Sequence, residues 1–331
     1  MDEQPQEVKY RPRTYLSVST LVNYARCKRR YFYDKCGLRS DGIMLAPRYG
    51  SCMHEAVPVA LETSNLGQSM DAFIKGWVEV EEEMELRGIE DKKRTRKHAE
   101  RSLQHFIFTH SGRKSIYNLV PPPEGALPLD DKTSSFEVPW AIDIGLRVPL
   151  VGRLDGMCEH RDTGESWIWE LKTTSRLNAG FFDAHEMYVQ NLTYVLVGQM
   201  LQIPVAGVII EGMLVDAKKV DNQCQMIPVQ EHHLEDVLLW LQQTGQSLLD
   251  AEENYALLEE QGDNPINSFP KDFTGCTPYT HYYMPAWRCD YADLCRVPDY
   301  RMLTDLFKVV PDHDFLQMTL EKDDIISPTP K

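Results

Sequence analysis

The sequence predicts an α/β protein with an additional helical part. Three runs between residues 134 and 175 are rich in β-branched and aromatic residues, and the turn sequence RDTGE at 161–165 joins the last two. A long helical pattern at 181–202 and an apolar strand pattern at 205–217 follow. This β-β-β-α-β order predicts a sheet covered by helices.

The remaining elements follow from the same periodicities. The first 18 residues are polar and contain proline, which predicts a loose arm, and a Ser or Thr cap opens an expected helix at 19–36. A further helix is expected to begin at Gly50 or Ser51, and two more at 70–87 and 92–111. The remaining expected segments are a proline-rich loop at 119–133, a weaker strand at 223–229, a helix at 234–260 and an aromatic, Pro- and Cys-rich region at 264–301.

Composition narrows the class of protein. With 331 residues, 42% of them hydrophobic, the chain can bury a sizeable core. A net charge of −15 argues against general nucleic-acid affinity but leaves room for a local basic patch. No apolar run is long enough to span a membrane, and the N-terminal residues MDEQPQEVKYRPRTY lack the apolar region of an export signal. The eight cysteines are therefore expected to be reduced thiols or metal ligands in a cytoplasmic protein.

The stretch SWIWELKTTS places two charges in a strand that is otherwise apolar. Side chains alternate along a strand, so Glu170 and Lys172 point to the same face. One interpretation is a weak ion pair on a solvent-exposed face. The other is an inward pair, which is costly unless a cation or another partner completes it.

The preceding strand supplies a third charged group. If Thr163 and Gly164 form the centre of the turn, Asp155 lies opposite Lys172 and diagonal to Glu170, all on one face. A slip of one residue would turn Asp155 away. Two carboxylates at one place select Mg²⁺ or Mn²⁺, and an adjacent lysine suits metal-assisted phosphodiester hydrolysis.

These residues also carry a resemblance. G-x-x-D from Gly152 to Asp155 and E-x-K from Glu170 to Lys172 resemble the core of the PD-(D/E)XK nucleases, and more closely the RecB-type branch with its CRISPR-adaptation nucleases and phage exonucleases. YGSCMHEAV resembles the G-x-x-x-H motif of that branch, QNLTY its Q-x-x-x-Y motif, and STLVNYARCKRRYFY its N-terminal helix. The resemblance extends from about Leu16 to Arg296. It implies a restriction-endonuclease-like mixed sheet flanked by helices.

The resemblance also implies roles for single residues. Asp155, Glu170 and His54 would bind Mg²⁺ or Mn²⁺, together with the backbone carbonyl of Leu171. Lys172 would act on the water or the transition state. The last pair, Gln190 and Tyr194, would position the DNA backbone or hold Lys172.

Cysteines at both ends of the resemblance form a second group. In the resembled branch, one N-terminal and three C-terminal cysteines hold a [4Fe-4S] cluster, which here implies Cys27, Cys276, Cys289 and Cys295. The sequence departs from the usual pattern, because Ala286 stands where many members have a cysteine. Zn²⁺, with His281 replacing one thiolate, is the alternative, as is a set of unrelated thiols, and Cys36 is the reserve ligand.

Two basic runs, CKRRYFYDK and KKRTRKHAER, are the candidate phosphate contacts, with a solvated charged face as the alternative. The residues expected to contact DNA are Arg29, Arg30, Lys93, Arg94, Arg96 and Lys97.

Together these features predict a metal-dependent DNA nuclease. We expect an exonuclease that prefers single strands or free ends and acts in recombination, repair or phage DNA processing, within a bacterium or a phage-infected cell and with a possible helicase or recombination partner. The alternatives are a catalytically inactive DNA-binding or assembly subunit and a zinc-containing RNA-processing protein. The expected organisation is an arm at 1–18, one nuclease domain at 19–301 with a helical insertion at 60–125, a catalytic core at 135–230 and a Cys-rich region at 264–301, and a tail at 302–331.

Overall fold

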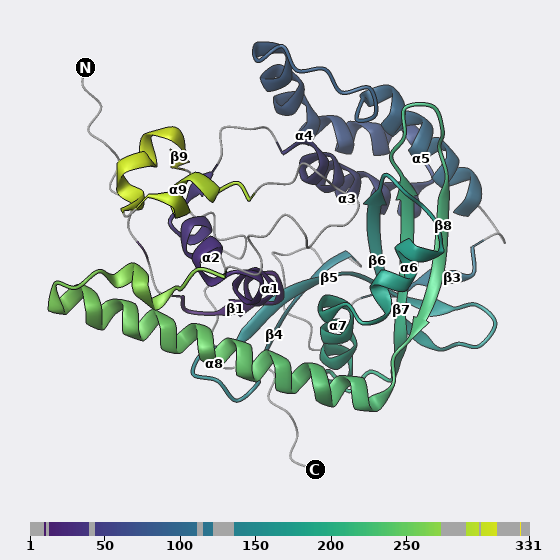
Figure 1. Ribbon diagram of the computed structural model, residues 1–331. Coiled ribbons are helices and arrows are strands. Elements are labelled where there is room, and N and C mark those ends of the chain that lie inside the picture. The colour runs from purple at the N-terminus through teal and green to yellow at the C-terminus, as the bar shows by residue number, and fades with distance from the viewer. Residues whose placement is uncertain are drawn as a thin grey trace. The chain divides into compact units, whose positions relative to one another are not determined.

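The computed structural model describes residues 10, 13–39, 44–110, 115–121, 136–272, 289–297, 299–309 and 325 (Figure 1). Contacts between Cα atoms group the chain into two compact units. Unit 1 comprises residues 1–42, 141–152 and 238–328, and unit 2 comprises residues 43–140, 153–237 and 329–331. The domain boundaries expected from the sequence stay a prediction.

Within the described residues, a mixed sheet of seven strands confirms the predicted fold class. The strands are β1 (Leu16–Ser17), β3 (Tyr117–Leu119), β4 (Phe136–Ile142), β5 (Leu150–His160), β6 (Ser166–Thr174), β7 (Val205–Leu214) and β8 (Asn222–Pro228). Their order is β1-β5-β6-β7-β8, and β3 and β4 also pair with β5. Strands β5 and β6 are antiparallel, β6 and β7 parallel, and β7 and β8 antiparallel.

The register of the β5–β6 hairpin differs from the prediction by two residues. Gly156 pairs with Trp169, so the ladder would bring Asp155 opposite Glu170 rather than opposite Lys172. The reason is a longer turn: the N–H of His160 donates to the carbonyl of Glu165 (2.9 Å) and Gly164 has a φ of 71°. Because side chains alternate with a period of two, this even shift leaves Asp155 on the predicted face.

Three helices of unit 2 cover one face of the sheet. They are α3 (Leu45–Thr63), α4 (Leu66–Leu86) and α5 (Arg96–His110), and they share a hydrophobic cluster with Trp169 and Leu171 of β6. Helix α3 begins before the predicted start at Gly50. Helix α5 begins after the predicted position 92, because the carboxylate of Asp91 accepts the N–H groups of Lys93 and Arg94 and holds them in a turn.

The helix expected at 181–202 is two helices, α6 (Ala179–Glu186) and α7 (Val189–Met200). No glycine or proline marks this break. It is held by Asn191, whose buried side-chain amide donates to the carbonyl of His185 (2.9 Å).

Helix α6 packs closely on strand β7 at Gly212. This glycine leaves room for Phe181 of α6, because a Cβ at Gly212 would lie 2.9 Å from the Phe181 ring.

Unit 1 contains the N-terminal helices and most of the long helix α8 (Glu231–Gln261). The single helix expected at 19–36 is interrupted at Cys27, which is extended between α1 (Val18–Arg26) and α2 (Lys28–Lys35). Smaller elements are η2 (Pro265–Ser268), α9 (Ala292–Arg296), η4 (Tyr300–Leu306), and the antiparallel pair β2 (Leu38–Arg39) and β9 (Lys308–Val309).

An aromatic cluster fills the core of unit 1. The ring of Tyr10 stacks on Phe32 at 5.7 Å, and its hydroxyl donates to the buried carboxylate of Glu252 (2.5 Å). Tyr10 is therefore packed, although it belongs to the segment expected to be a loose arm. Among the described residues, no helix has both the length and the apolar character needed to cross a membrane.

Candidate active site

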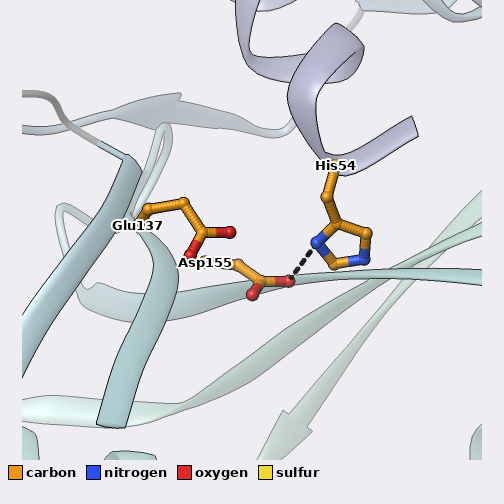
Figure 2. Close-up of side chains that lie close together, drawn as sticks. All are labelled: His54, Glu137 and Asp155. Carbon is orange, nitrogen blue, oxygen red and sulfur yellow. Dashed lines mark ion pairs between the residues drawn. The ribbon is translucent and has the colours of Figure 1, made fainter. Parts of the chain in front are cut away.

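The candidate site lies in unit 2, where β5 and β6 cease to pair. The described ladder stops at Gly156 and Trp169, and beyond it the carboxylate of Asp155 accepts the backbone N–H of Leu171 (3.0 Å). The same oxygen, Oδ2, lies 3.4 Å from Nδ1 of His54 on α3 (Figure 2). The structure thus brings two of the predicted ligands, Asp155 and His54, into contact.

Glu170 forms the centre of the site. Its side chain is fully buried, and its Oε1 accepts hydrogen bonds from Nζ of Lys172 and from Nε2 of Gln190 (2.9 Å). Gln190 also donates to the hydroxyl of Tyr194 (2.7 Å). The other carboxylate oxygen, Oε2, is buried and has no hydrogen-bond partner among the described residues. A buried carboxylate oxygen without a partner is costly, so a cation or donor that completes it would stabilise the site.

The raised pKa values of the two carboxyl groups also indicate a place for a cation. Burial raises the pKa of Asp155, although Lys172 opposes the shift, and burial together with the negative charge of Asp155 raises the pKa of Glu170. Both acids therefore resist ionisation while no cation neutralises them. Burial lowers the pKa of Lys172, but Glu170 and Asp155 outweigh it and the net shift is upward, so the lysine carries a positive charge.

His54 has the properties of a metal ligand. Burial lowers the pKa of its imidazole, which is consequently neutral at physiological pH and can offer a lone pair. A backbone hydrogen bond with Leu171 acts in the opposite direction, which places the main chain of Leu171 beside the ring. The Leu171 carbonyl that the family resemblance implied as a ligand stays a prediction.

Glu137 is a further acid at the site that the sequence reasoning missed. One ligand atom each from His54, Glu137 and Asp155 lies within 4.8 Å of the others, and Figure 2 shows the three side chains pointing toward one another. Glu137 has a φ of 52°, which is rare for a residue with a side chain and diverts it from ordinary strand alternation. The only sequence signal was an acid near the start of an apolar strand. Oxygen and imidazole ligands of this kind fit Mg²⁺ or Mn²⁺.

Three cysteines of unit 1, Cys27, Cys289 and Cys295, act on one another electrostatically. Burial raises the pKa of Cys289, while the Tyr291 N–H and Arg30 lower it and Cys27 raises it. Burial likewise raises the pKa of Cys295, and Cys289 adds to the shift. Three neighbours, Tyr33, Lys271 and Arg29, oppose this rise without cancelling it.

The structure says less about the other residues that were expected to bind the cluster or zinc. Cys276 and His281 lie outside the described residues. Burial raises the pKa of Cys36 to about 12, so this reserve ligand is a protonated thiol.

The basic residues expected to contact DNA fall into two groups. Arg29 is buried and donates to the carbonyls of Phe269 (2.6 Å) and Ile266 (3.3 Å), so its guanidinium stabilises unit 1 and we remove it from the expected DNA contacts. The others lie nearer the surface. Arg30 is 3.9 Å from Asp34, Arg94 pairs with Asp91 (2.7 Å), Arg96 pairs with Glu81 (2.6 Å), and Lys93 and Lys97 are exposed.

Comparison with known proteins agrees with this geometry. The family model of the PD-(D/E)XK nuclease superfamily matches residues 15–296. No curated protein matches the chain significantly. The matched region contains Asp155, Glu170 and Lys172, the acids and the lysine that converge in unit 2. On this match over most of its length, the chain belongs to the PD-(D/E)XK nuclease superfamily.

Proposed function

We propose that the protein is a metal-dependent deoxyribonuclease. The observation that carries the proposal is the fully buried Glu170, which lies beside Asp155 and the charged Lys172 and whose Oε2 has no partner in the part of the chain that the structure describes. A purely structural ion pair would leave neither an unpartnered oxygen nor a second acid at the same place. Membership of a nuclease superfamily supports DNA as the substrate.

The residues that would hold Mg²⁺ or Mn²⁺ are Asp155, Glu170, His54 and the carbonyl of Leu171, and we add Glu137. When bound, the cation would lower the pKa of a water and neutralise charge on the phosphate. In the hydrolysis, the water oxygen forms a bond to phosphorus as the bond to the leaving oxygen breaks, and the proton released by the water balances the one that the leaving group gains.

Lys172 contributes a positive charge rather than a base. In the metal-free protein Glu170 and Asp155 raise its pKa, so the amine there carries a proton. An ammonium at this position stabilises negative charge that develops on the phosphate. Gln190 supports this role because it binds Glu170 and thereby fixes the carboxylate that holds Lys172.

The finer proposal is an exonuclease of the RecB-type branch, with single-strand or end preference, in recombination, repair or phage DNA processing. Support comes from two motifs of that branch, since His54 contacts Asp155 and Gln190 contacts Glu170 and Tyr194. The alternative is an inactive DNA-binding subunit of a helicase or recombination complex. The complete set of acids and the lysine favours the enzyme.

Two proposals, that the protein is a deoxyribonuclease and that it is an exonuclease, are tested by one assay. It measures the degradation of end-labelled linear DNA and of circular DNA, each single- and double-stranded, in the presence of Mg²⁺ or Mn²⁺. Wild type should consume linear DNA from an end and spare circles, while Glu170→Gln and Lys172→Ala are inactive. Glu165→Gln, which changes an exposed acid in the β5–β6 turn, is the matched control and should retain activity. A wild type that binds DNA but is as inert as both variants would replace the enzyme with the binding subunit.

We also propose that Cys27, Cys276, Cys289 and Cys295 hold a [4Fe-4S] cluster. Support comes from the electrostatic interaction of Cys27 with Cys289 and of Cys289 with Cys295, which indicates that these three thiols lie near one another. The alternative is Zn²⁺ in an RNA-processing protein. Iron, sulfide and zinc contents of anaerobically purified protein separate the two, with Cys295→Ser expected to lose the metal and the exposed Cys224→Ser to keep it.

A further inference from the structure

The junction between α6 and α7 is a built feature of unit 2 beside the candidate site. Met187 and Tyr188 interrupt the two helices, and the amide of Asn191, which is 1% exposed, holds the break by donating to the carbonyl of His185. Gln190, two residues after Tyr188, donates a hydrogen bond to the carboxylate of Glu170 at the centre of the site. The junction is therefore fixed in position within one helical turn of the active-site contacts.

Flat and polarisable side chains gather at this junction. The imidazole of His185 lies 5.8 Å from the ring of Tyr188 in an edge-to-face arrangement. Met187 is 59% exposed, an unusual fraction for a large apolar side chain. His185 Nδ1 is buried and has no hydrogen-bond partner among the described residues.

Both rings lie within electrostatic reach of the active-site lysine. Burial and the ammonium of Lys172 lower the pKa of His185 to about 4, so its imidazole is uncharged at physiological pH. Tyr188 also lies within electrostatic range of Lys172. An uncharged imidazole and an aromatic ring are thus found near the amine that would meet the scissile phosphate.

Charge distinguishes which part of a nucleic acid this surface fits. Asp183 and Glu186 of α6 are exposed next to the junction and repel phosphates. A duplex presents phosphates outward and keeps its bases stacked inside, whereas a single strand can offer an unpaired base to an aromatic side chain.

We propose that the α6–α7 junction binds an unpaired base of single-stranded DNA next to the scissile phosphate, with Tyr188 and Met187 as its contacts. This inference rests on the proposed nuclease function and names the form of DNA that the site accepts. The aromatic ring supplies the stacking surface, the thioether covers the base edge, and Lys172 takes the adjoining phosphate.

The test uses full-length Glu170→Gln protein, which is expected to bind DNA without cutting it. The probe is an oligodeoxythymidine with one 2-aminopurine, whose fluorescence falls when the base stacks. Tyr188→Leu and Met187→Ala are compared with Tyr188→Phe, which keeps the ring. Leu86→Ala is the control for an exposed apolar residue of unit 2, at 87% exposure. Melting temperatures of all variants identify any that fail to fold.

The inference predicts quenching at one position of the single strand. Tyr188→Leu should abolish the quenching and weaken single-strand binding about tenfold, as for one lost base stack, with duplex binding unchanged. Met187→Ala should weaken binding less, and Tyr188→Phe and Leu86→Ala should match the parent. Unchanged single-strand binding in folded Tyr188→Leu, or equal losses for single strand and duplex, would overturn the inference.

Cleavage by the otherwise wild-type protein separates this inference from the proposed function. If wild type cuts DNA and Tyr188→Leu changes nothing, the junction proposal fails and the nuclease stands. If wild type never cuts DNA but single-strand binding depends on Tyr188, the junction proposal stands and the enzyme fails.

Discussion

Replacing Glu170 by Gln should make the metal-free protein more stable at alkaline pH. The substitution keeps the shape of the side chain and an oxygen for Lys172 and Gln190, but it removes a charge that burial disfavours. Burial is the largest cause of the raised pKa of Glu170, so the folded protein retains a proton there that the unfolded chain releases. The free energy of unfolding of wild type must then fall as the pH rises from the ordinary pKa of a glutamate to the raised pKa of Glu170 in the folded protein.

The size of the effect follows from the shift. The pKa of Glu170 rises from 4.5 to about 7, and each unit corresponds to about 1.36 kcal/mol. The free energy of unfolding of Glu170→Gln, relative to wild type, should therefore increase by about 3 kcal/mol between pH 4.5 and pH 8. This shift already includes the repulsion from Asp155, whose negative charge is the second cause of the raised pKa of Glu170.

Urea unfolding in EDTA, followed by tryptophan fluorescence at several pH values, measures this difference. Glu165→Gln, which changes an exposed carboxylate of the same hairpin, should run parallel to wild type. Addition of Mg²⁺ at pH 8 should stabilise wild type and leave Glu170→Gln nearly unchanged. A variant that follows the wild-type pH dependence, or is less stable at pH 8, would refute the reasoning, since Lys172 alone would then neutralise Glu170.

Three further predictions concern other parts of the molecule. Glu137→Gln should weaken Mn²⁺ binding about tenfold in calorimetry, because the loss of one charged ligand should cost about 1.4 kcal/mol of binding free energy. The melting temperature in EDTA should not change. Equal Mn²⁺ affinity of variant and wild type would remove Glu137 from the ligand set. Arg29→Leu should lower the free energy of unfolding by about 2 kcal/mol in urea titrations, because two buried carbonyls lose their charged donor, and a selective loss of DNA affinity in a stable variant would restore the phosphate contact. Gly207→Ala should be strongly destabilised in thermal melts, because a Cβ there would lie 2.1 Å from the carbonyl oxygen of Ile227, whereas Gly180→Ala meets its nearest atom at 3.7 Å and should melt like wild type.

Strand alternation accounts for what the sequence could predict of the site. Glu170 and Lys172 share a face whatever the neighbouring strand does, because they are two residues apart. Asp155 depended on the register, which was wrong by two residues, yet an even shift preserves the face and a shift of one would not have.

Features that depend on tertiary contacts were beyond sequence reasoning. The break at Met187 has no proline or glycine to announce it, because it depends on a hydrogen bond from Asn191. Arg29 belongs to a basic run that suggested a surface, but the same helix carries three buried aromatic residues that draw its guanidinium inward. Glu137 was missed since its left-handed backbone breaks the alternation on which the other predictions relied.

The end of the β5–β6 ladder explains how one hairpin can hold two acids at one place. Where strands pair, backbone N–H groups are used by the ladder and buried carboxylates have no donors. Beyond Gly156 and Trp169 the strands no longer pair within the described ladder, and the N–H of Leu171 becomes available to Asp155. Glu170 receives its donors from Lys172 and Gln190 on one oxygen only. The fold thus satisfies each acid in part, and within the described residues it leaves one buried oxygen, Oε2 of Glu170, without a hydrogen-bond partner.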